Sequence, residues 1–325
     1  MMKFIWIDDN PERIISSNNL AASLEIKCDF IDVNKQDVGE IIQNLLKDEE
    51  PELIIIDHNL IDSIPNTNLI KKGSSAASII RQQWKECPIV CFTGMEPSIV
   101  DSQEKNIYEE MYPIENISNY YAEIHSIATS FNEIKRKKPE SINSLLTLLK
   151  CPIIDQEKVK AIIPKNLKEN FHDGGLIIEI SNWVRKTLMS RPGFLYDELW
   201  AATLLGLNET GFEKVKDTFE RAKYTGIFSN DKNPRWWKSE LINILGENVN
   251  SPGLPSHRGR LLERITEDDY SKCHATQEAF PETVAFVDES RDSVAVAIKL
   301  RETILHGGYE KLLYFDEIRL MAPLQ

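Results

Sequence analysis

The stretch MKFIWIDDNPER, from Met2 to Arg13, introduces a pattern that the first part of the chain repeats. Its apolar run has the length and the residue types of a buried β-strand. The run ends on two adjacent carboxylates, Asp8 and Asp9, and no basic residue stands next to them. Adjacent carboxylates repel each other unless they face different ways or a positive charge lies between them. The pair therefore needs a neutralising partner from outside this stretch.

Further apolar runs follow, and helical patterns separate them. CDFIDV (28–33), PELIIID (51–57) and PIVCFTG (88–94) have the features of buried strands, and EMYPIENI (110–117) is a weaker fifth run. Residues 11–24, 37–50 and 75–86, and those from 119 onward, have helical spacing. Such alternation is typical of a parallel sheet that helices cover on both faces. We therefore predict a doubly wound, five-stranded parallel α/β sheet.

Polar side chains stand where the predicted strands end. Asp8 and Asp9 end the first strand, Asp57 ends the third and Thr93 ends the fourth. Sites in such folds gather at the carboxyl ends of the strands. Mg²⁺ is usually held by one or two carboxylates with carbonyl, water and phosphate oxygens. The acids therefore favour a Mg²⁺ site, with the hydroxyl of Thr93 at its rim. The alternative is that each acid caps the helix that follows it.

The layout IWIDD, IIIDHNL, GSSAASIIR and PIVCFTG resembles the receiver (CheY-like) domain of bacterial two-component response regulators over about residues 1–135. The resemblance implies a flavodoxin-like strand order and a histidine kinase or another phosphodonor as partner. A bound metal would screen the crowded acids and balance the charge of the incoming phosphoryl group. The implied site residues are Asp57 as phosphoacceptor, Asp8, Asp9, Asp57 and the backbone carbonyl of Asn59 as Mg²⁺ ligands, and Thr93 as a hydroxyl switch.

Three departures from the family pattern mark a divergent receiver. The family has a lysine before the proline that ends strand five, and here Tyr112 stands before Pro113. The switch aromatic three places earlier corresponds to Glu109, and Tyr108 is one place off. The segment HNLIDSIPNTNLIKKG (58–73) is longer than usual at the mouth of the site, as a lid or a partner-binding loop would be.

The rest of the chain is predicted to be mostly α-helical. The basic run and proline of KRKKPESIN (135–143) mark a boundary, and a polar stretch, GENVNSPGLPSHRGR, spans 246–260. Between them, helix, turn, helix and a hairpin around 230–234 follow the order of a winged-helix module. We predict a receiver-like domain over 1–137, a helical, winged-helix-like domain over 138–245 and a C-terminal helical segment over 246–325.

Basic residues of the winged-helix-like stretch are compatible with nucleic-acid contact. Trp236 and Trp237 stand among them and could stack on bases or pack inside the protein. In an acidic protein, a solvated face or a protein-docking surface is an equal alternative. The basic residues are Lys214, Lys216, Arg221, Lys223, Lys232, Arg235 and Lys238.

Arg301 and His306 stand in KLRETILHGGYEK near the end of the sequence. An arginine and a histidine held together could bind a phosphodiester and move a proton during RNA cleavage. The dozen residues resemble the Arg-x4-to-6-His motif of HEPN-type ribonucleases, in which the two side chains are catalytic. The alternative is that His306 caps a helix before Gly307 and Gly308.

Composition narrows the class of protein. The 325 residues are 42% hydrophobic and 27% charged, as in a globular protein, and the net charge of −13 argues against broad binding to nucleic acids or anionic membranes. Five cysteines without a CxxC pair indicate reduced thiols. No membrane span or signal peptide is recognised, so we expect a cytoplasmic protein without membrane association. A homodimer is compatible with the receiver resemblance.

Three functions follow from these patterns. The first is a response-regulator-like signalling protein whose divergent receiver controls a helical output region. The second is a non-phosphorylated pseudo-receiver that acts as an adaptor in a multi-protein complex. The third is a receiver-gated, HEPN-like ribonuclease that uses Arg301 and His306.

Overall fold

The structure is a computed structural model of the chain, and it divides into two compact units. Unit 1 consists mainly of Met1–Leu148 with Pro164–Trp183, and unit 2 mainly of Leu149–Ile163, Val184–Ser229 and Asn233–Gln325. The predicted domain boundaries at 137 and 245 stay a prediction. The described residues are 1–35, 37–60, 70–169, 171, 176–190, 193–230, 233–272, 279, 283–287, 293–297 and 314–315.

Unit 1 contains a parallel sheet of five strands, which confirms the predicted fold class. The strand order is β2-β1-β3-β4-β5, the flavodoxin-like order, in which successive strands are added on one side of β1 and then, from β3 onward, on the other. Because β1 and β3 are neighbours, their carboxyl ends lie side by side at the edge where ligands bind in such sheets. The strands are β1 (Lys3–Asp8), β2 (Lys27–Asp32), β3 (Leu53–Asp57), β4 (Ile89–Thr93) and β5 (Glu110–Pro113).

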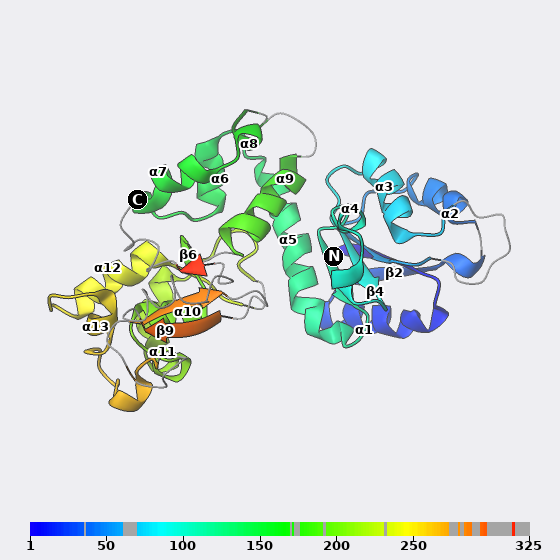
Figure 1. Ribbon diagram of the computed structural model, residues 1–325. Helices are drawn as coiled ribbons and strands as arrows, with labels where there is room; N and C mark the ends of the chain where they lie inside the picture. Colours follow the sequence, from blue (N-terminus) through cyan, green and yellow to red (C-terminus); the bar gives the residue numbers. More distant parts are fainter. Residues whose placement is uncertain are drawn as a thin grey trace. The chain divides into compact units, whose positions relative to one another are not determined.

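Helices cover both faces of this sheet (Figure 1). On one face, α2 and α3 pack against each other and share a core with alternate strand residues such as Ile5, Ile7 and Ile56. On the other face, α1 packs against α5. The helices of the sheet are α1 (Ile14–Leu24), α2 (Val38–Leu45), α3 (Gly73–Gln83), α4 (Ser102–Lys105) and α5 (Tyr121–Lys137). Unit 1 also holds α6 (Ile142–Leu148), α8 (Lys165–Glu169) and α9 (Leu176–Trp183).

The alternation of side chains along β1 places its apolar and acidic residues. Successive residues of a strand point to opposite faces, so Phe4, Trp6 and Asp8 share the face opposite Ile5 and Ile7. Asp8 is therefore on the same face as the buried indole of Trp6, two residues earlier. This arrangement matters for the candidate site below.

Unit 2 is largely helical, as predicted, around a core rich in aromatic residues. The short strand β7 (Trp236–Trp237) pairs antiparallel with β6 (Leu195–Tyr196). The winged-helix assignment stays a prediction, and Asp231 and Lys232 of its proposed hairpin lie outside the described residues. The helical segments are α7 (Ile153–Ile162), a π-helix (Val184–Leu188), α10 (Glu198–Leu204), α11 (Glu209–Val215), a 3-10 helix (Lys216–Ala222), α12 (Lys238–Asn248) and α13 (Pro255–Gly259).

The prediction of a helical final segment is wrong for three stretches of the described residues, which form strands. β8 (Thr283–Val287) and β9 (Ser293–Ala297) pair antiparallel, and β10 (Tyr314–Phe315) pairs with β8 on its other side. TVAFV and SVAVA are rich in β-branched residues, which favour strands. Short apolar runs are ambiguous between helix and strand in sequence, and here the strand partners decided the outcome.

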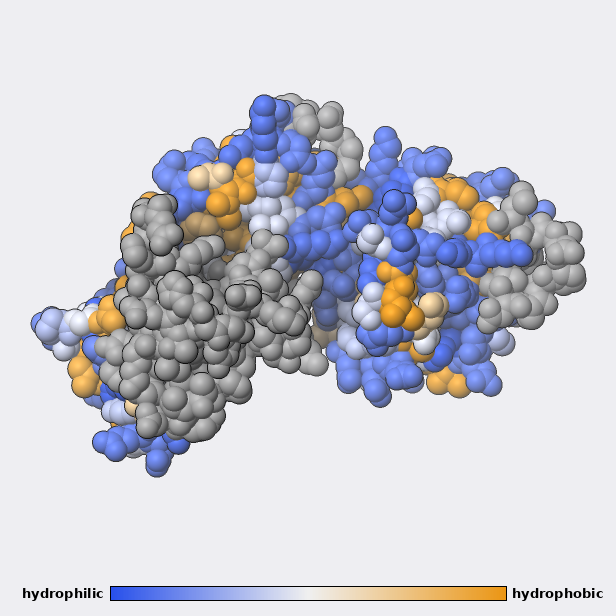
Figure 2. Space-filling view, in the orientation of Figure 1, coloured by the Kyte–Doolittle hydropathy of each residue, from blue (hydrophilic) through white to orange (hydrophobic). Residues whose placement is uncertain are grey.

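On the face seen in Figure 2, the described surface is mostly hydrophilic, and apolar residues form separate groups. Among the residues that the structure describes, no helix combines the length and apolar character needed to cross a bilayer.

Candidate functional site

Three carboxylates from distant parts of unit 1 meet at the carboxyl edge of the sheet. Ile7 of β1 pairs with Ile56 of β3, so the next residues along the two strands, Asp8 and Asp57, are neighbours. One carboxylate oxygen from each of Asp8, Asp9 and Asp57 lies within 4.8 Å of the others. The strand register therefore brings together acids that are 49 residues apart in the sequence.

Asp8 is buried at the end of β1, with 2% of the residue exposed. Its Oδ2 accepts a hydrogen bond from the indole Nε1 of Trp6 at 3.1 Å, and its Oδ1 accepts one from the Asn10 backbone N–H at 2.9 Å. Burial raises the pKa of this carboxyl, and the two hydrogen bonds oppose that rise. The two hydrogen bonds thus fix the orientation of the Asp8 carboxylate, and burial makes its charged form less favourable.

The charged form of the Asp57 carboxyl is also unfavourable. Burial, together with repulsion from Asp8 and Asp9, raises its pKa to about 7, although backbone N–H groups of His58 and Asn59 donate toward it. The Asn59 N–H lies 3.1 Å from Oδ2 of Asp57. Around neutral pH the carboxyl of Asp57 is therefore close to balance between its charged and protonated forms, and a nearby cation would favour the charged form.

The acidic cluster fits a hard divalent cation. Carboxylate and carbonyl oxygens are the ligands that Mg²⁺ prefers, and three mutually repelling carboxylates supply the negative charge. Within the described part of the chain, no basic side chain forms an ion pair with Asp8 or Asp57. Arg13 interacts electrostatically with Asp8 as the weakest of the influences on its pKa, and burial still leaves that pKa raised.

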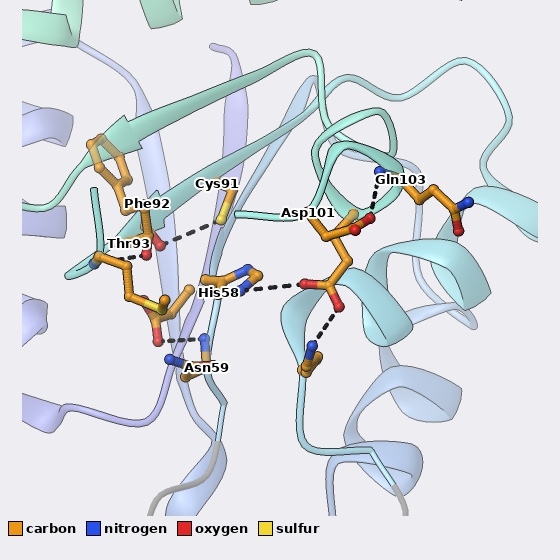
Figure 3. Close-up of polar contacts among 11 residues, drawn as sticks. His58, Asn59, Cys91, Phe92, Thr93, Asp101 and Gln103 are labelled. Carbon is orange, nitrogen blue, oxygen red and sulfur yellow. Dashed lines mark hydrogen bonds and ion pairs between the residues drawn. The ribbon is translucent and has the colours of Figure 1, made fainter. Parts of the chain in front are cut away.

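Thr93 and Gly73 are neighbours of Asp57 in the fold. Thr93, 1% exposed at the end of β4, accepts a hydrogen bond at Oγ1 from the Met95 N–H at 3.0 Å (Figure 3). Gly73 begins α3, and a Cβ atom added there would lie 2.0 Å from the carbonyl oxygen of Asp57. Only glycine lets α3 begin this close to the backbone of Asp57.

The departures at Tyr112 and Glu109 have structural explanations. The Tyr112 ring, 4% exposed, packs between the rings of Phe92 and Tyr120 at centroid distances of 5.7 and 4.6 Å. Glu109, 3% exposed, accepts hydrogen bonds from Arg81 of α3 at 2.9 and 3.0 Å and from the backbone of β4. Both side chains therefore have packing and bonding roles inside unit 1.

A second polar group beside Asp57 was not predicted from the sequence. His58, 4% exposed, places Nε2 3.5 Å from Oε2 of Glu104 on α4, and Lys72 pairs with the same carboxylate (Figure 3). Lys72 also forms an antiparallel bridge with Asn59, which joins the two ends of the inserted segment. Residues 61–69 of that segment lie outside the described residues. No local pattern links residues so far apart in the sequence.

The basic residues of the winged-helix-like stretch contact groups within unit 2. Trp236 and Trp237 are 0% and 2% exposed, so their rings are packed inside the protein and not available to stack on bases. Nucleic-acid binding here stays a prediction without support from these contacts. The ion pairs are Lys214–Asp269, Lys216–Glu198, Arg221–Glu247, Lys223–Glu220 and Arg235–Asp197, and Lys238 lies over the Tyr196 ring. Lys232, Arg301 and His306 lie outside the described residues.

The N-terminal region has a five-stranded parallel sheet in the flavodoxin-like order, with acids at the ends of β1 and β3. Response-regulator receiver domains share this fold. No protein-family model and no curated protein matches the sequence.

Solved receiver structures are similar to this region. A two-component response regulator from Clostridium difficile is 18% identical, with 41% of this chain and 99% of that chain covered and a TM-score of 0.32. A response regulator from Thermotoga maritima, solved in complex with Mg²⁺ and BeF, is 17% identical, with 39% and 99% covered and a TM-score of 0.32. A chemotaxis response regulator of Vibrio cholerae is 15% identical, with 39% and 98% covered and a TM-score of 0.32.

The raised pKa of Asp57 predicts how stability depends on pH without metal. Between the unfolded pKa of about 3.9 and the folded pKa of about 7, the folded state keeps a proton that the unfolded state has lost. The contribution of Asp57 to the free energy of unfolding is therefore largest below about pH 4 and is lost as the pH rises through 7. Urea unfolding of the wild type and of Asp57→Asn across this range measures the contribution as the difference between the two pH profiles. Parallel profiles would contradict the raised pKa.

Proposed function

We propose that this protein is a receiver-type signalling protein in which Asp8, Asp9, Asp57 and the backbone carbonyl of Asn59 hold Mg²⁺ and Asp57 accepts a phosphoryl group. The receiver region would control the largely helical remainder of the chain, and the donor would be a histidine kinase or another phosphodonor. The observation that carries the proposal is the convergence of the three carboxylates within 4.8 Å.

The proposed chemistry is nucleophilic attack by a carboxylate. A lone pair on a carboxylate oxygen of Asp57 attacks the phosphorus of the donor, the new O–P bond forms, and the old P–X bond breaks with its electron pair leaving on the donor. Bound Mg²⁺ would supply charge neutralisation between the acids and the transferred group. Asp57 must be ionised to attack. Its pKa is raised to about 7 without metal, and bound Mg²⁺ would favour the ionised form.

The other residues of the rim orient the nucleophile. The Asn59 N–H donates to Oδ2 of Asp57 at 3.1 Å and so helps to fix the orientation of the carboxylate. Thr93 ends the neighbouring strand β4. Its oxygen accepts from the Met95 N–H, and its hydroxyl proton can donate to a phosphoryl oxygen.

A non-covalent analogue tests this function. Adding beryllofluoride with Mg²⁺ is expected to raise the midpoint of thermal unfolding beyond the effect of Mg²⁺ alone, because it mimics a phosphoryl group on Asp57. Asp57→Ala should lose the extra effect, whereas Thr129→Ala, a change on α5 whose hydroxyl bonds only to its own helix, should keep it. Equal responses of the wild type and Asp57→Ala would reject phosphorylation at Asp57.

A second candidate function is a non-phosphorylated pseudo-receiver that serves as an adaptor. The packed ring of Tyr112 and the buried ion pair of Glu109 with Arg81 favour it, because both tie β5 to neighbouring elements. This function predicts partner binding that survives Asp57→Asn and is lost when the inserted segment 59–73 is shortened. Binding that depends on beryllofluoride would instead support the first function.

A further inference from the structure

We propose that Trp6 is a positioning residue of the acidic site, whose indole N–H holds the Asp8 carboxylate in the orientation that binds a divalent cation. The inference rests on the proposed cation binding by Asp8, Asp9 and Asp57 and names a residue that supports it. The two side chains are in direct contact, with Nε1 of Trp6 3.1 Å from Oδ2 of Asp8.

The contact follows from the geometry of β1. Residues two apart on a strand project from the same face, so the indole of Trp6 lies along the strand from Asp8. Trp6 is 0% exposed and Asp8 is 2% exposed, so water does not compete for this hydrogen bond. With the Asn10 N–H on the other oxygen, each oxygen of Asp8 accepts one protein hydrogen bond and keeps a lone pair for a cation.

The indole is itself held in place by a row of aromatic rings. Trp6 stacks on Phe92 of β4 with a centroid distance of 5.5 Å and an interplanar angle of 10°. Phe92 contacts Tyr112 of β5, and Tyr112 contacts Tyr120, the residue just before α5. Tyr112 therefore supports, through Phe92, the indole that orients Asp8. This gives the tyrosine before Pro113 a role that a lysine could not fill.

A purely structural explanation would be that a buried indole simply needs an acceptor. Three of the five other buried tryptophans argue against that need in this chain. The Nε1 atoms of Trp183, Trp236 and Trp237 have no hydrogen-bond partner among the described residues. Burial alone does not bring an acceptor to an indole here, and at Trp6 the acceptor belongs to the acidic cluster.

The test measures Mg²⁺ affinity, with the metal alone as the probe. Trp6→Phe keeps an aromatic ring against Phe92 and removes the indole N–H donor together with part of the ring volume. We expect it to weaken Mg²⁺ binding by about 10- to 100-fold, as for other residues that orient a metal ligand. Trp84→Phe is the matched control, because Trp84 is a buried tryptophan of unit 1 at the far end of α3. It should bind Mg²⁺ like the wild type. Calorimetry gives both affinities.

Two outcomes distinguish a failure of the Trp6 role from a failure of the proposed Mg²⁺ site. If the wild type does not bind Mg²⁺, the proposed cation site fails, and the role of Trp6 fails with it. If the wild type binds and Trp6→Phe binds equally well, only the positioning role is overturned. Should Trp6→Phe not fold, the indole N–H resonance of Trp6 in ¹⁵N-labelled full-length protein is the second measurement. A shift on adding Mg²⁺ that Asp57→Asn abolishes supports the role, and an unmoved resonance overturns it.

Discussion

Replacing Asp57 by asparagine is expected to abolish stabilisation of the protein by Mg²⁺ and to stabilise the metal-free protein at about pH 8. Above its pKa of about 7, the Asp57 carboxyl is charged and repels Asp8 and Asp9. Asparagine keeps the size of the side chain and removes the charge. We expect the metal-free variant to gain on the order of 1 kcal/mol in its free energy of unfolding, a small fraction of what full burial of a charge could cost.

The metal-dependent part of this prediction has the opposite sign. In the wild type, Mg²⁺ at about ten times its dissociation constant should add about 1.4 kcal/mol to the free energy of unfolding, and the variant should gain almost nothing. Urea unfolding with and without Mg²⁺ measures both parts. Asp48→Asn, at an exposed position on the surface, removes one charge from the protein as a control and should respond to Mg²⁺ like the wild type. A full Mg²⁺ response in Asp57→Asn would show that the cation binds elsewhere.

Replacing Gly73 by alanine should be the most destabilising single change near the site. The added Cβ would lie 2.0 Å from the carbonyl oxygen of Asp57, 3.1 Å from its carbonyl carbon and 3.2 Å from the hydroxyl of Tyr108. Two of these atoms are backbone, so α3 or the end of β3 must move. We expect a loss of roughly 2–4 kcal/mol in the free energy of unfolding, as for other overpacked or strained sites, despite the better helix propensity of alanine.

The same change should weaken Mg²⁺ binding, because it displaces the backbone that carries Asp57 and Asn59. Gly94→Ala is the matched control at the same edge of the sheet, since a Cβ added there meets nothing within 4 Å. It should leave both stability and Mg²⁺ affinity close to those of the wild type. Denaturant unfolding and calorimetry on the three proteins measure these effects. A Gly73→Ala variant as stable as the wild type would mean that α3 does not begin this close to Asp57.

The local sequence was sufficient to predict the strands and the acids at their ends, because runs of apolar residues mark buried strands. The apolar runs predicted the five strands, because a strand buried on both faces needs a nearly continuous apolar segment. The positions of Asp8, Asp9 and Asp57 at strand ends placed them at one edge, since parallel strands bring their carboxyl ends together. The contact between Trp6 and Asp8 also had a local signal, the spacing of two on a strand, and it was missed.

Ion pairs between residues far apart in the chain could not be predicted from local sequence patterns. The ion pair of Glu109 with Arg81 joins residues 28 apart, and the contact of His58 with Glu104 depends on where α4 lies. The ion pairs of the basic residues in unit 2 likewise appear only once their acidic partners are in place, and they give those residues structural roles.

The amino-acid sequence by itself determined which segments form the sheet and which acids reach its edge, because side-chain periodicity and strand ends are local properties. Only the tertiary structure decided that Tyr112 packs against Phe92, that Gly73 touches the backbone of Asp57, and that TVAFV and SVAVA pair as strands. These features depend on close packing and hydrogen bonding between segments far apart in the chain, which no local pattern encodes.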